Sequence, residues 1–173
     1  MTLGKNAKAI IKWTIYSLLL LLLYCIQTAP SLLTIHHIKP VLLIPLAVCI
    51  ALFEGEIGSA VFGLIAGFLW DFAAGKVFGF YGMALMICCL LTALLSMYLM
   101  RVNVVNALLS VGAVSLVCNI WNFLFYYLIW GFKGVWISFG QLLLSSLYTM
   151  VFAAPLFYLV RLIATKFNYT IRT

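Results

Sequence analysis

The sequence predicts an all-α protein that lies in a membrane and crosses it six times. Of its 173 residues, 67% are hydrophobic and only 8% are charged. A soluble domain carries about 45–50% apolar and about 25% charged residues, so this chain could not cover a surface exposed to water. Its apolar residues also form runs bounded by charges, glycines and prolines, and several runs approach the roughly 20 residues of a spanning helix. The length suits a single integral membrane domain over residues 1–173.

The expected spans are separated by short links that contain charged residues, Gly or Pro. They are residues 10–28, 40–53, 57–70, 80–100, 104–129 and 137–163. The first span follows several lysines and resembles a signal peptide, but the region after it is a poor cleavage site. An uncleaved first span is therefore favoured over a removed leader. Pro155 interrupts the last span and is expected to kink it.

The second and third runs are short. Fourteen residues of helix rise about 21 Å, less than the roughly 30 Å hydrocarbon core of a bilayer. Flanking residues could extend both helices to full spans, or the two could form a hairpin that enters the membrane and returns. The link Glu54-Gly55-Glu56 fits both arrangements. Full spans are favoured, because two carboxylates at the bilayer centre would need partners that the sequence does not reveal.

Charge predicts the orientation. The net charge is +7, from ten basic residues against three acids. If the first residues are cytoplasmic, seven basic residues lie inside (Lys5, Lys8, Lys12, Arg101, Arg161, Lys166, Arg172) and three outside (Lys39, Lys76, Lys133). This excess predicts that both termini are cytoplasmic. The basic residues are not interleaved with exposed aromatic residues, so the expected contact is the lipid bilayer and no nucleic acid.

The reactive residues do not form a recognisable catalytic or metal-binding set. All five cysteines lie inside apolar runs without a CxxC pair, and His36-His37 has no cysteine or acid nearby. Neither a zinc site nor a disulfide framework is predicted. No hydrolase, metalloprotease or phosphate-binding motif is present, and three acids leave little for acid–base chemistry. The sequence therefore predicts a protein that is not an enzyme and uses no cofactor.

A ladder of small residues is the most informative pattern in the chain. It runs through Gly55, Ser59, Gly63 and Gly67 in steps of four and ends at Asp71. Small residues at this spacing let two helices in a membrane approach closely. The row drifts about 40° per step around a helix, so two or three rungs, Ser59, Gly63 and Gly67, are expected to meet one neighbour. Packing within the chain is favoured, and the helix of another protein is the alternative.

Asp71 is expected at the outer, C-terminal end of the third helix. A carboxylate there faces the negative end of the helix dipole, so it requires hydrogen-bond donors. The candidates are Lys76, Lys39 or the backbone N–H groups of residues 73–75. Two roles are open: Asp71 shapes the loop through a local turn, or it contacts the extracytoplasmic part of a partner protein.

Asn119 and Asn122 share one face of the expected fifth helix. Amides in a membrane commonly form hydrogen bonds between helices, and this role is favoured over lining a small-molecule pocket.

Several stretches together resemble a known family. They are Pro40-Val-Leu-Leu-Ile-Pro45, Glu54-Gly55-Glu56, Gly63-Leu-Ile-Ala-Gly-Phe-Leu-Trp-Asp71 and Phe78-Gly79. With the chain length, the six spans and a late proline followed by a basic residue, the region 40–162 is similar to the bacterial rod shape-determining protein MreD. The most specific part is the Gly-x-x-x-Gly-x-x-x-Asp run, with a glycine eight residues after the acid.

The resemblance implies a function. MreD-like proteins are non-enzymatic components of the cell-elongation machinery in the bacterial inner membrane. They bind the bitopic protein MreC and help to control cell shape and peptidoglycan synthesis, with RodA-type and class B penicillin-binding proteins as further partners.

The family also looks similar in fold to the substrate-binding subunits of energy-coupling-factor vitamin transporters. A solute-binding transporter subunit is therefore the alternative function, because one fold can host several functions. Those subunits commonly carry an Ala-xxx-Ala docking motif in the first span, and residues 10–28 contain no alanine. A vitamin site would also need several polar groups that converge near the outer face, and the sequence offers few. The resemblance therefore favours the scaffold.

Overall fold

The computed structural model describes residues 5–29, 41–75, 79–99, 102–130 and 135–167. These residues form six α-helices and no strand, so the predicted all-α class is confirmed. The helices are α1 (Lys5–Thr28), α2 (Leu43–Phe53), α3 (Glu56–Ala74), α4 (Phe80–Tyr98), α5 (Val104–Trp130) and α6 (Val135–Phe167). Within the described residues, five helices are long and apolar enough to cross a membrane, and α2 is the shorter one.

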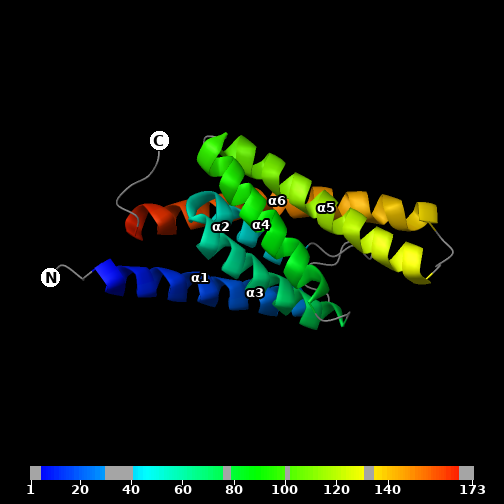
Figure 1. The fold of residues 1–173 in the computed structure, drawn as a ribbon, viewed down its shortest axis with the longest axis horizontal. Helices are drawn as coiled ribbons and strands as arrows, with labels where there is room; N and C mark the ends of the chain where they lie inside the picture. The colour runs from blue at the N-terminus through cyan, green and yellow to red at the C-terminus, as the bar shows by residue number, and fades with distance from the viewer. Residues whose placement is uncertain (1–4, 30–40, 76–78, 100–101, 131–134, 168–173) are drawn as a thin grey trace.

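Consecutive helices alternate in direction along the long axis of the molecule (Figure 1). At the left of that view α1 begins, α2 gives way to α3, α4 gives way to α5, and α6 ends. This is the arrangement expected of helices that cross a bilayer in turn, each burying one face against its neighbours and leaving the other to lipid. Large apolar side chains are accordingly exposed along the outer faces, for example Leu18, Ile65, Ile87 and Leu109.

Helix α2 lies at the centre of the bundle. All ten residues from Leu43 to Leu52 are buried, and α2 contacts each of the other five helices. Pro45 falls in its first turn, where a missing backbone N–H leaves no intrahelical hydrogen bond unmade. The helix ends at Phe53, and the C-cap residue Glu54 has an extended backbone (φ −100°, ψ 165°). Its 11 residues rise about 17 Å, less than the core thickness. The start of the expected span, Pro40, lies outside the described residues.

Helix α3 continues four residues further than the sequence suggested. It ends at Ala74, before Gly75 with φ 60°, because alanines favour the helix and a glycine in the left-handed conformation terminates it. Asp71 therefore lies inside the last turn of α3 and does not follow its end. Glu56, expected in the link, lies in the first turn of this helix.

The late proline and the two asparagines of the sequence lie in the last two helices. Pro155 lies inside α6. Asn119 and Asn122 are half-buried on α5, and each has an interaction partner.

Candidate functional site

Helices α3 and α4 touch backbone to backbone at two rungs of the ladder. A Cβ atom on Gly67 would lie 2.5 Å from Gly82 Cα and 2.5 Å from Tyr81 O. One on Gly63 would lie 2.9 Å from both Leu85 O and the side chain of Cys89. These distances leave no room for any side chain at either position. The two glycines thus pack against another helix of the same chain, and α3 and α4 form the most extensive helix pair in the bundle.

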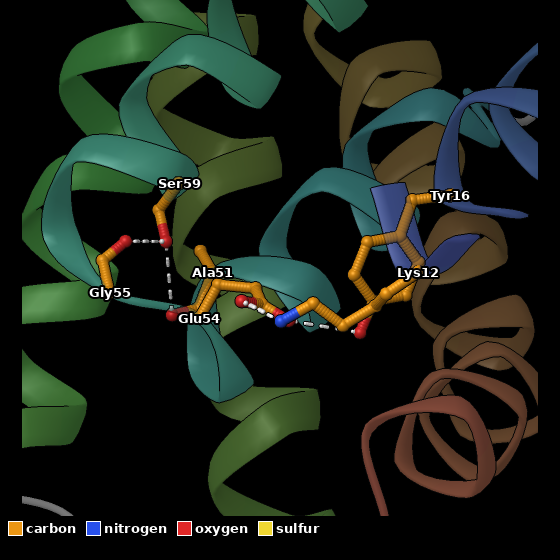
Figure 2. A network of polar contacts seen from close by, with 6 residues as sticks. All are labelled: Lys12, Tyr16, Ala51, Glu54, Gly55 and Ser59. Carbon is orange, nitrogen blue, oxygen red and sulfur yellow. Dashed lines mark hydrogen bonds and ion pairs between the residues drawn. The ribbon is translucent and has the colours of Figure 1, made fainter. Parts of the chain in front are cut away.

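Ser59 and Gly55, the two earlier rungs, have different surroundings. Ser59 is buried, and its Oγ donates a hydrogen bond of 2.9 Å to Gly55 O, with Ala51 O at the end of α2 as a second acceptor 3.5 Å away (Figure 2). Nothing lies within 4 Å of a Cβ atom placed on Gly55. The sequence predicts that two or three of Ser59, Gly63 and Gly67 meet one neighbour; Gly63 and Gly67 both lie against α4, whereas the hydroxyl of Ser59 reaches the end of α2. The rotation of about 40° at each step of four explains the division.

Asp71 is a buried acceptor for the start of α4. Its Oδ2 accepts hydrogen bonds from the N–H groups of Gly79 (2.9 Å) and Gly82 (3.3 Å), and its Oδ1 accepts one from Tyr81 N–H (3.0 Å). The first N–H groups of a helix have no partner within it, so a carboxylate from a neighbouring helix satisfies them. Gly82 is also the residue that Gly67 contacts. One crossing therefore combines close packing and capping.

The donors to Asp71 differ from those that the sequence suggested. They lie at the start of α4, beyond residues 73–75, and the candidates Lys39 and Lys76 fall outside the described residues. The partner-contact role would require an accessible carboxylate, whereas the Asp71 side chain is almost fully buried. Gly79 was the available signal in the sequence. It lies eight residues after Asp71 and immediately precedes α4, whose first N–H groups are the donors.

We expect Asp71→Asn to lower stability by about 1–3 kcal/mol, the cost of leaving a buried donor without an acceptor. Asparagine keeps the size and one oxygen, but its NH₂ group cannot accept from the N–H groups that face it. Thermal melting of the detergent-solubilised variant checks this. Phe72→Leu is the matched control, because the neighbouring Phe72 is exposed. An Asp71→Asn variant that melts with the wild type would show that the capping is dispensable.

A second polar cluster joins α1 to the turn between α2 and α3. Lys12 Nζ lies 2.8 Å from Glu54 Oε2, and Tyr16 OH donates a hydrogen bond of 3.2 Å to Glu54 Oε1 (Figure 2). The Lys12 and Glu54 side chains are 10% and 8% exposed, so this is a buried ion pair. The sequence alone assigns Lys12 to topology and reveals no partner for Glu54. Lys12 and Tyr16, four residues apart on one helix face, were the available signal.

A third polar contact holds the start of α2. Gln27 Oε1, on α1, accepts hydrogen bonds from Leu42 N–H (2.9 Å) and Leu43 N–H (3.4 Å). Thr149 Oγ1, on α6, accepts one from Val41 N–H (3.4 Å). The buried end of α2 thereby finds the acceptors that lipid cannot supply. No pattern in the sequence predicts these roles for Gln27 and Thr149.

These sites share one chemistry. Each uses a side chain of one helix to satisfy a charge or a backbone group at the end of another. In the part of the chain that the structure describes, no group of three or more His, Cys, Asp or Glu residues is placed to hold a metal ion. The arrangement is suited to fixing helices relative to one another within a membrane.

A comparison with protein families finds a match to the model described as rod shape-determining protein MreD, over residues 7–166. The matched region contains all the polar sites described above, and it confirms the resemblance seen in the sequence. Searches of curated proteins and of solved structures find no match.

Proposed function

Because this chain belongs to the MreD family of rod shape-determining proteins, we propose that it is a non-enzymatic scaffold that binds an MreC-like membrane protein. The single observation that carries this proposal is the family match, which extends over residues 7–166. The family implies a role in rod shape determination in a bacterial membrane, and five apolar helices suit a multi-pass protein. Binding to MreC, and through it an influence on RodA-type and class B penicillin-binding enzymes, is the finer step that we propose.

The ladder serves internal packing in this proposal. Gly63 and Gly67 lie against α4, and Asp71 caps it. A partner helix could reach these residues only by displacing α4. The MreC-like partner therefore binds elsewhere on the bundle, and variants of Gly63, Gly67 and Asp71 lose partner binding only together with folding.

Co-purification tests the proposal. The protein, expressed with an MreC-like protein from the same source, is expected to retain it through detergent solubilisation and gel filtration, and its depletion is expected to turn rod-shaped cells round. A membrane protein of unrelated family but similar size is the control for retention. A stoichiometric vitamin in the purified protein, or co-purification with a transporter ATPase pair, would instead favour the transporter subunit.

The proposed topology has six membrane segments and both termini in the cytoplasm. It rests on the alternating helix directions (Figure 1) and on the seven-to-three distribution of basic residues. Reporter fusions after Thr173 and within residues 132–135 are expected to report opposite compartments, with the first cytoplasmic. A fusion after Thr173 that is active only outside the cytoplasm would contradict this topology.

A further inference from the structure

The depth of α2 in the membrane cannot be set by the bilayer. The bilayer fixes the depth of a helix when the apolar length of the helix matches the thickness of the hydrocarbon core and its surface contacts lipid. The 11 residues of α2 rise about 17 Å, roughly half of the 30 Å core. Its residues from Leu43 to Leu52 are all buried. Contacts with other helices must therefore fix its position along the membrane normal.

Helix α1 contacts α2 at both ends through polar groups. At the C-terminal end, Glu54 is bound by Lys12 and Tyr16, which we call the Glu54 clamp (Figure 2). At the N-terminal end, Gln27 accepts hydrogen bonds from the N–H groups of Leu42 and Leu43, which we call the Gln27 clamp.

For one pair of partners in each clamp, the spacing is the same on both helices. Tyr16 and Gln27 are 11 residues apart on α1 (27 − 16), and Leu43 and Glu54 are 11 residues apart on and just beyond α2 (54 − 43). Each interval corresponds to about 17 Å of helix rise. Two antiparallel helices with equal intervals can make both contacts at once only in one register. A shift of α1 by a single turn would move Gln27 away from Leu42 and Leu43 and would leave Glu54 only one of its two present partners.

Lipid, in contrast, can contact the outer face of α1. It is the least buried of the five long helices, and Leu18, Leu21 and Leu22 on its outer face are exposed. It is also long enough to cross the membrane, so the bilayer can fix its depth. The clamps then transmit that depth to the buried helix.

We propose that α1 helps to set the depth of α2 in the membrane through the Glu54 and Gln27 clamps, which add directional polar contacts to the more extensive packing of α2 against the other helices. This device is independent of the proposed function, because it concerns how the bundle holds its shortest helix. A change in bilayer thickness, or a protein bound to α1, could therefore change the position of α2 at the centre of the bundle by moving α1.

Cysteine labelling at Gly55 measures the depth of the far end of α2. Gly55 is exposed, and nothing would lie within 4 Å of a Cβ atom there, so Gly55→Cys is accommodated. The protein is placed in lipid nanodiscs, where both membrane faces are accessible, and is reacted with a membrane-impermeant maleimide. Labelling of the parent protein without this substitution is subtracted, because Cys25 is exposed.

The two clamps are expected to give opposite results. Gln27→Leu removes this acceptor from the N–H groups of Leu42 and Leu43. Because these N–H groups are then more stable in water, α2 is expected to shift toward the membrane surface at its N-terminal end. Gly55 is then withdrawn, and its labelling rate falls at least threefold. Lys12→Met leaves the Glu54 carboxylate without its cation. The unpaired carboxylate favours water, so the C-terminal end of α2 is expected to shift toward the opposite membrane surface and labelling of Gly55→Cys to rise at least threefold. General loosening would raise labelling in both variants.

Two conservative variants complete the test. Gln27→Glu keeps the acceptor oxygens and is expected to restore the parent labelling rate. Thr28→Val is the matched control, since the exposed Thr28 hydroxyl donates only within its own helix, to Tyr24 O. If Gln27→Leu does not fold, Gln27→Asn, which is too short to reach Leu42, takes its place. An unchanged or raised labelling rate in the folded Gln27 variant would overturn the proposal.

Discussion

Replacing Gly67 by leucine is expected to abolish folding of the bundle or to reduce its folded yield severely. Even the first added carbon would lie 2.5 Å from both Gly82 Cα and Tyr81 O. These atoms belong to backbone, so no side chain can turn aside to make room. Overpacking costs about 1–3 kcal/mol and occasionally more, and here the two helices must separate. Separation would also withdraw the start of α4 from Asp71.

Fluorescence-detected gel filtration of the solubilised protein measures this result. Gly67→Ala is expected to fail nearly as badly as leucine, whereas Gly63→Leu fails because of contacts with Cys89 and Leu85. Gly55→Ala is the matched control from the same ladder, because nothing lies near its Cβ position. Leu64→Ile should be tolerated. Normal folded yield of the Gly67 and Gly63 variants would show that α3 and α4 do not cross where the structure places them.

Replacing Lys12 by methionine is expected to destabilise the protein by about 3–5 kcal/mol, the usual cost of removing one partner from a buried ion pair. Glu54 would keep only the Tyr16 hydroxyl among the partners in Figure 2. The midpoint of unfolding in increasing sodium dodecyl sulfate, followed by tryptophan fluorescence, measures the loss.

The double variant Lys12→Met with Glu54→Gln distinguishes the ion pair from simple packing. It removes both charges together, so no unpaired carboxylate stays buried, and most of the lost stability should return. If the double variant is as unstable as the sum of the single variants, the two residues contribute independently and the pair is not the cause.

The sequence by itself determined the class of the protein. Composition and the length of the apolar runs predicted helices in a membrane, because lipid forces each segment to satisfy its own backbone hydrogen bonds. The run from Gly63 to Asp71 also supported the family resemblance, which the match over residues 7–166 confirms. Four-residue spacing further marked α3 as a helix that packs closely. All of these signals are local, so a single sequence contains them.

The tertiary structure decided which groups meet. Lys12 and Glu54 are 42 residues apart in the chain, and Gln27 and Leu42 are 15 residues apart, so no local pattern links either pair. Gly82 mattered as much as Gly67, yet it stands outside the ladder, because a close crossing needs a small residue on both helices. The sequence places Asp71 at the end of α3, and the structure shows that its carboxylate caps the start of α4. Only the packing of six helices places buried donors opposite these acceptors, since an unsatisfied polar group in a membrane is costly.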